Sequence, residues 1–286
     1  DNREQSKWRF DWERFVPEFF RNVETRVGQL RDLGIEADVI IFHPYDRWGF
    51  ANLPPEVEDR YLRYVCARLG AYRNVWWSFA NEWDFVRNKT IDDWERYARV
   101  VREHDPYDHL RGIHNGAKLY DHGKPWVTHV SYQGHPHQVV QLRKDYGKPV
   151  VVDECCYEGD VPNNWGNISA RELTHRFWLA TCLGGYCGHG ETYLHPKDIL
   201  WWGKGGVLHG QSPERIAFLR KIVEQGEGRG FEPIRCGGQI AAARGEGEIL
   251  LFTYDHQPAR LEAKLPDGGQ YAIEVIDPWE MTVQAL

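Results

Sequence analysis

Residues 74–85 read NVWWSFANEWDF, an apolar run that stops abruptly at an amide and a carboxylate, Asn81 and Glu82. The run from 74 to 81 has the length and aromatic content of a β-strand. It shows no alternation of polar and apolar residues, so both faces of the strand are expected to be buried. In parallel folds, reactive groups commonly follow the carboxyl ends of such strands. The stretch therefore predicts a buried strand that carries Glu82 at its end.

Runs of the same kind recur along the chain and alternate with helical stretches. Ser169 and Glu172 form a capping-box pattern at the start of one of these helices. Continuously apolar strands that alternate with helices indicate a parallel sheet covered on both faces. The expected strands are 37–42, 74–81, 110–115, 126–132, 149–154 and 184–190, and the expected helices are 56–72, 92–104, 137–147 and 169–182, with a loop and a helix over 1–36.

Two folds share this alternation: the doubly wound nucleotide-binding sheet and the barrel. No G-x-G-x-x-G motif or phosphate-binding loop follows a strand, which argues against the first fold. Several runs instead end in polar, chemically able residues, as barrel strands do. We therefore expect an α/β fold of the TIM (β/α)8 type. The polar strand ends are His43, Asn81 and Glu82, His114 and Asn115, Tyr132 and Gln133, Asp153 and Glu154, and His189 and Glu191.

The sequence pattern changes near Phe231, where short β patterns punctuated by glycine begin. The Asp267-Gly268-Gly269 turn is typical of a hairpin between two such runs. We therefore expect a barrel domain over 1–230 and a small antiparallel β domain over 231–286. A barrel closes with eight strands, and fewer are visible, so we expect the first two βα units to be absent from this chain. A preceding segment or another subunit would then have to supply them.

Composition narrows the possible functions. The chain has 286 residues, of which 42% are hydrophobic, so it can bury a substantial core. A net charge of -7 without a basic stripe argues against nucleic acid as a partner, and no apolar run approaches the roughly 20 residues that cross a bilayer. The six cysteines include no C-x-x-C pair, which favours free thiols over disulfides or a zinc site and slightly favours the cytoplasm.

Glu82 and Glu154 each end an apolar strand, so a barrel would place both at one mouth. Glycoside hydrolysis needs two such carboxyl groups, one to protonate the leaving oxygen and one to attack or to activate water. Asn81 gives Glu82 an amide neighbour, whereas PVVVDE places Glu154 where burial can tune its pKa. A single strand-end glutamate is more often part of an ion pair, but two in these contexts favour catalysis.

Longer motifs carry a family resemblance. The chain resembles clan A retaining glycoside hydrolases, and in particular a poorly characterised group of bacterial glycosidases related to the apiosidase-like barrels, which have β domains before and after the barrel. The resemblance implies that Glu82 is the acid/base and Glu154 the nucleophile. It also implies a carbohydrate substrate, and we expect no cofactor. The motifs are FHPYDRWGF (42–50), NVWWSFANEWDF (74–85), VVVDECCYEG (150–159), GHGETY (188–193), WWGKGGVLHG (201–210) and VIDPWEM (275–281).

Further residues are candidates for sugar binding. Tyr132 is expected to donate a hydrogen bond to Glu154, and Glu191 to bind a sugar hydroxyl. Trp201 and Trp202 form either a stacking platform or ordinary packing. The complete set of candidates is His43, Asp46, Arg47, Trp48, Asn81, His114, Tyr132, Gln133, Glu191, Trp201 and Trp202, with Tyr45 in the same stretch as the first four.

Two alternatives stay open. One is a metal-dependent barrel hydrolase that uses His43, His114 and Glu154, although the His135 and His137 pair fits no zinc spacing. The other is a carbohydrate-binding barrel without activity, or an inactive fragment. The compartment also stays open, because sugar hydrolases are often exported.

Overall fold

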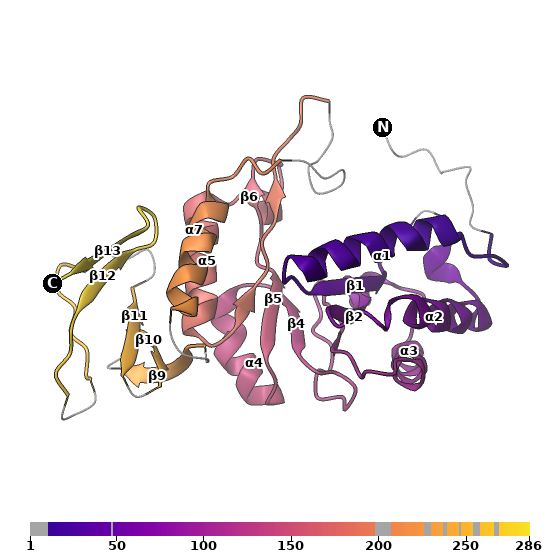
Figure 1. Ribbon diagram of the computed structural model, residues 1–286, viewed down its shortest axis with the longest axis horizontal. Coiled ribbons are helices and arrows are strands. Elements are labelled where there is room, and N and C mark those ends of the chain that lie inside the picture. Colours follow the sequence, from indigo (N-terminus) through magenta and orange to yellow (C-terminus); the bar gives the residue numbers. More distant parts are fainter. Residues whose placement is uncertain are drawn as a thin grey trace. The chain divides into compact units, whose positions relative to one another are not determined.

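The computed structural model describes residues 11–46, 48–197, 207–225, 230–236, 239–245, 247–253, 258–265 and 269–286 (Figure 1). The chain divides into two compact units, Asp1–Ser131 and Tyr132–Leu286. The division falls inside the stretch that we expected to form one barrel domain. A domain boundary between 230 and 231 stays a prediction.

The first unit contains a parallel sheet in the order β1-β2-β3. The strands predicted at 37–42 and 74–81 are confirmed, whereas the one predicted at 110–115 is shorter. On the edge of β3 that faces away from β2, the backbone N–H of Arg111 donates to the side-chain oxygen of Thr128 at 2.8 Å. The elements are α1 (Pro17–Asp32), β1 (Ala37–Phe42), η1 (Phe50–Asn52), α2 (Pro55–Leu69), β2 (Val75–Ala80), η2 (Trp83–Phe85), α3 (Ile91–His104) and β3 (Arg111–Gly112).

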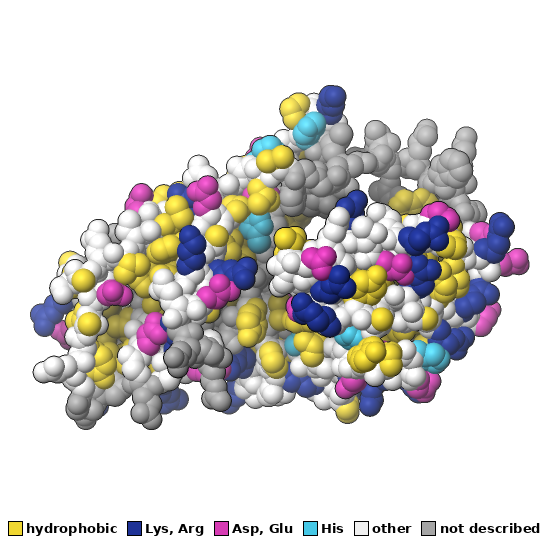
Figure 2. All heavy atoms as spheres, in the orientation of Figure 1, with side chains coloured by type: hydrophobic (Ala, Val, Ile, Leu, Met, Phe, Trp, Pro, Cys, Tyr) yellow, Lys and Arg dark blue, Asp and Glu magenta, His cyan; other side chains and the backbone are white. Residues whose placement is uncertain are grey.

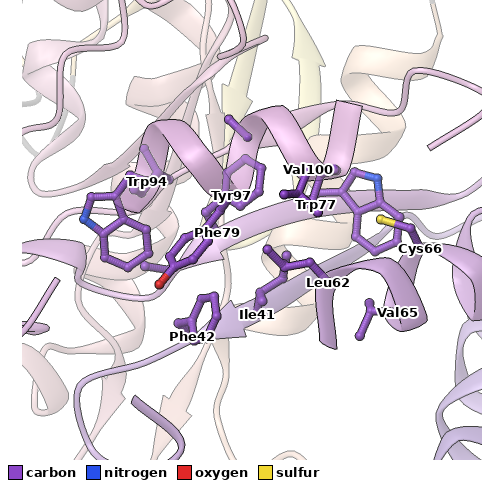
Figure 3. Packing of buried hydrophobic residues seen from close by; sticks show 14 of the residues in the cluster. Ile41, Phe42, Leu62, Val65, Cys66, Trp77, Phe79, Trp94, Tyr97 and Val100 are labelled. Carbon is purple, nitrogen blue, oxygen red and sulfur yellow. The ribbon is translucent and has the colours of Figure 1, made fainter. Parts of the chain in front are cut away.

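The core of the first unit lies between this sheet and helices α2 and α3 (Figure 3). Trp77 and Phe79 of β2 are fully buried and point toward Leu62 of α2 and Tyr97 of α3. Ser78, on the opposite face of β2, is also buried. Burial on both faces is why this strand is continuously apolar in sequence.

Local signals fix the helix starts. Thr90 and Asp93 form a reciprocal capping box at the start of α3. Ser169 accepts the backbone N–H of Glu172 at 3.1 Å, which caps α5 as its sequence predicted. Helix α2 instead begins at Pro55, whose missing N–H and fixed φ suit the first helical turn.

The second unit contains a three-stranded sheet in the order β4-β5-β7, in which β5 and β7 are parallel. A separate parallel pair, β6 and β8, consists of two-residue strands. The strand predicted at 149–154 is confirmed, and those predicted at 126–132 and 184–190 are shorter. The elements are β4 (Val130–Gln133), η3 (Pro136–Gln138), α4 (Val139–Tyr146), β5 (Val150–Glu154), β6 (Glu158–Gly159), η4 (Asn164–Gly166), α5 (Ala170–Cys182), β7 (Tyr186–Cys187), β8 (Glu191–Thr192) and α7 (Ser212–Glu224).

The C-terminal part is antiparallel, as predicted. Strands β9 (Glu232–Cys236), β10 (Gln239–Arg244) and β11 (Glu248–Phe252) form one sheet, and β12 (Glu274–Asp277) pairs with β13 (Thr282–Ala285). On the N-terminal side of the predicted hairpin turn, the described residues 259–265 form no strand. The centre of the predicted hairpin turn, Asp267 and Gly268, lies outside the described residues.

The protein is thus an α/β fold with antiparallel C-terminal sheets. On the face seen in Figure 2, Lys and Arg side chains lie among Asp and Glu side chains. Among the described helices, none is long and apolar enough to cross a membrane.

Candidate functional site

Glu82 follows β2 at a point fixed by both neighbouring strands. The N–H of Asn81 donates to the carbonyl of Phe42, and the N–H of Trp83 donates to the carbonyl of His114, both at 2.9 Å. Between them Glu82 has a left-handed backbone, with φ 48° and ψ 58°. Such a conformation costs about 1–2 kcal/mol for a residue with a side chain, and strained residues of this kind cluster at functional sites.

The Glu82 carboxyl group is held from two sides. The Tyr45 hydroxyl donates to Oε2, and the Asn81 amide donates to the same oxygen at 3.2 Å. Glu82 is only 7% exposed. A buried carboxyl group at a strained strand end, with a phenol and an amide among its donors, is a candidate for chemistry.

His114 supports the backbone of Glu82. The N–H of Glu82 donates to Nδ1 of His114 at 3.4 Å, so the ring proton lies on Nε2. Burial lowers the pKa of His114 to about 4, which keeps the ring neutral. Its Nε2 is buried and has no hydrogen-bond partner among the described residues.

Tyr45, whose hydroxyl donates to Glu82, also lines a cavity of about 640 Å³. The loop after β1 forms one wall, and the stretch that follows Glu82 forms another. Asp46 shapes the first wall, because its carboxylate accepts the N–H groups of Trp48 at 2.8 Å and Ala51 at 2.9 Å. The lining residues are Pro44, Tyr45, Asp46, Ala51, Asn52, Phe85, Val86, Arg87 and Asn88.

In the second unit, Glu154 is the last residue of β5 and is half-buried. Its carbonyl accepts the N–H of Gly134 at 2.9 Å, which fixes the strand end. Two residues later Cys156 adopts a left-handed backbone with φ 68°, so both candidate glutamates lie at sharply turned strand ends. Arg176 donates to the carbonyl of Cys155 at 2.5 Å and holds this turn.

Tyr132 differs from expectation. In the described part of the chain its hydroxyl makes no hydrogen bond to Glu154. The side chain instead folds over Gly134, where an added Cβ would lie 2.2 Å from the Tyr132 hydroxyl oxygen. Burial raises the pKa of Tyr132, and the phenol therefore stays protonated at neutral pH.

Glu191 is buried beside a glutamate that sequence reasoning missed. Its Oε2 accepts the N–H of His209 at 2.8 Å, and it pairs in register with Glu158 across β6 and β8. Glu158 accepts hydrogen bonds from Tyr193, Gln211 and Ser212 at 2.6–3.0 Å. Both carboxylates hold the segment that leads into α7. Oε1 of Glu191 is buried and has no hydrogen-bond partner among the described residues, and a role of Glu191 in sugar binding stays a prediction.

The structure therefore brings part of the predicted set together. In the first unit, Glu82 contacts Asn81, His114 and Tyr45, and His43 accepts the backbone N–H of Tyr45 at 3.2 Å. Glu154, Tyr132 and Gln133 belong to the second unit. Among the described residues, no cluster of three or more His, Cys, Asp or Glu side chains could hold a metal ion. Arg47, Trp201 and Trp202 lie outside the described residues.

Comparison with known families supports the resemblance drawn from the motifs. Residues 2–205 match the family described as apiosidase-like, catalytic domain. Residues 236–286 match a domain of unknown function, DUF5605. No curated protein matches the chain.

Solved structures extend this result. A candidate glycoside hydrolase from Bacteroides vulgatus ATCC 8482 is 39% identical with a TM-score of 0.89, and the match covers 97% of this chain and 58% of that one. A glycoside hydrolase family 5 protein from the same organism is 15% identical with a TM-score of 0.65, over 82% of this chain and 62% of that one. The second likeness concerns the fold alone. This chain spans less than two thirds of the length of either structure.

Proposed function

The chain belongs to the family of apiosidase-like catalytic domains, and on that premise we propose that it is a glycoside hydrolase that cleaves O-glycosidic bonds with retention of configuration. Glu82 and Glu154 are the two carboxyl groups of this proposal. The parallel strands alternating with helices, together with the fold likeness to a family 5 hydrolase, support a TIM-type barrel.

In the first step, Glu154 attacks the anomeric carbon while Glu82 gives its proton to the departing glycosidic oxygen. The bond from carbon to that oxygen breaks, and a glycosyl ester of Glu154 forms. In the second step, the Glu82 carboxylate takes a proton from water, which attacks the same carbon and releases Glu154. Two inversions give net retention. This mechanism requires the two carboxyl groups to lie about 5–5.5 Å apart in the working enzyme.

The observation that carries the proposal is the setting of Glu82. A carboxyl group buried at a strand end, held by Tyr45 and Asn81, is well suited to exchanging a proton with a bound substrate. Tyr45 also lines a cavity whose volume of about 640 Å³ is in the range of small-molecule sites.

The test is release of aryl leaving groups from a panel of aryl glycosides that differ in the sugar. We expect wild type to turn over at least one member, and Glu82→Ala and Glu154→Ala to lose that turnover. Glu103→Ala, which changes an exposed glutamate on α3, is the matched control and should keep full activity.

Two outcomes would contradict the proposal. Turnover abolished by a chelator and restored by a divalent cation would favour the metal-dependent hydrolase. Sugar binding without turnover, unchanged in Glu82→Ala and Glu154→Ala, would favour a carbohydrate-binding protein.

A further inference from the structure

Tyr45 reaches Glu82 from a different strand end. It lies three residues after β1, whereas Glu82 lies two residues after β2. The parallel register, with Phe42 opposite Ala80, brings these two strand ends side by side. The Tyr45 hydroxyl then donates to Oε2 of Glu82.

The loop that carries Tyr45 is held by hydrogen bonds of its own. The N–H of Tyr45 donates to Nδ1 of His43 at 3.2 Å. The carboxylate of Asp46 binds two backbone N–H groups further along the same loop, at Trp48 and Ala51. These hydrogen bonds fix the backbone of the loop from which the Tyr45 side chain extends.

Tyr45 also lines the cavity of about 640 Å³, together with Phe85 from the stretch after Glu82. A general acid must reach the glycosidic oxygen that it protonates. We infer that Tyr45 is a positioning residue that orients Glu82 for this proton transfer. This inference rests on the proposed function.

The chemistry follows from the donor pattern. Tyr45 and Asn81 both donate to Oε2, which assigns the transferred proton to Oε1. As the glycosidic bond breaks, that proton moves from Oε1 to the leaving oxygen, and negative charge grows on the carboxyl group. A hydrogen bond to a charged group is worth more than one to a neutral group, so the Tyr45 contact strengthens during this step. The Tyr45 hydrogen bond therefore stabilises the transition state most for leaving groups that must be protonated to depart, and least for those that depart as anions.

The test compares Tyr45→Phe with wild type on one sugar bearing leaving groups of different acidity. A dinitrophenolate departs without protonation, whereas an unsubstituted phenolate needs it. We expect Tyr45→Phe to lower kcat/KM about tenfold or more for the phenyl glycoside and less than about threefold for the dinitrophenyl glycoside. Tyr107→Phe, which changes an exposed phenol, is the control and should leave both rates unchanged. Equal losses on both substrates, or no loss, would overturn the inference while the proposed function stood.

A second measurement does not depend on turnover. In a double-mutant cycle of Tyr45→Phe and Glu82→Gln, followed by urea unfolding, the two changes should be non-additive because the side chains are in contact. Additive effects would overturn the inference, since the contact would then be absent in solution. A wild type that hydrolyses no glycoside in the panel would contradict the proposed function itself and with it the catalytic use of Tyr45.

Discussion

Glu158 accepts both the backbone N–H and the hydroxyl of Ser212, the first residue of α7, at 3.0 and 2.6 Å. The same carboxylate accepts the Tyr193 hydroxyl at 2.7 Å. Burial acts to raise the pKa of Glu158, but the hydrogen bonds from Ser212 and Tyr193 outweigh it and the pKa is lowered. Glu158 is thus a buried carboxylate that anchors the start of a helix, where the helix dipole also favours negative charge.

Glu158→Gln should therefore destabilise the second unit. The amide nitrogen of glutamine would face groups that donate, so we expect a loss of about 2–3 kcal/mol in the free energy of unfolding. Urea unfolding and amide hydrogen exchange of α7 would measure it. Glu224→Gln, at the exposed end of the same helix, should change stability by less than about 0.5 kcal/mol. Equal stability of the two variants would contradict the anchoring role.

Two glycines in the first unit should respond oppositely to alanine. A Cβ at Gly112 would lie 2.8 Å from Nε2 of His129, which is buried and has little room to move. Gly112→Ala should cost about 1–3 kcal/mol. Gly28 lies inside α1, and its Cβ would meet Tyr72 at an ordinary 3.8 Å, so Gly28→Ala should add up to about 1 kcal/mol. Thermal unfolding of both variants checks the signs.

Stability should fall as the pH drops below neutrality. Burial lowers the pKa of His114 and of His129 from 6.5 to about 4 each. Between pH 6.5 and pH 4 the histidines of the unfolded chain bind more protons than the buried histidines of the folded chain. The free energy of unfolding is therefore highest above pH 6.5 and decreases as the pH falls toward 4. From pH 7 to pH 5 each histidine should contribute a loss of up to about 2 kcal/mol.

Urea unfolding at the two pH values would measure this loss. His129→Gln should show a flatter pH dependence than wild type, whereas His104→Gln, which changes an exposed histidine, should follow wild type. A wild type equally stable at pH 5 and pH 7 would contradict the burial of these rings.

The parts of the fold that could be predicted from sequence are those buried on both faces over several residues. β2 is such a strand, and β5 is buried or half-buried along its whole length. β1 has exposed residues at Asp38 and Ile40, but its continuous apolar run was still recognisable in the sequence. β6 and β8 are only two residues long and leave no periodic signal. The burial of Glu158 was therefore invisible in the sequence.

In the candidate site, too, some features could be predicted from the sequence and others could not. Glu82 was predicted because polarity appears abruptly after an apolar strand. The contact between Tyr45 and Glu82 was not predicted, because it depends on the register of β1 against β2 and on the turn braced by Asp46. Tyr132 was expected to donate a hydrogen bond to Glu154. In the structure its side chain lies over Gly134 instead, a position that the sequence does not indicate.

Azide rescue of Glu154→Ala tests the central claim most directly. The substrate is an activated aryl glycoside that wild type hydrolyses, and Glu103→Ala is the control. We predict that Glu154→Ala loses turnover and that azide restores release of the aryl group, with a glycosyl azide of inverted configuration as the product. Full turnover by Glu154→Ala without azide, or lost turnover that azide does not restore, would contradict the assignment of Glu154 as the nucleophile.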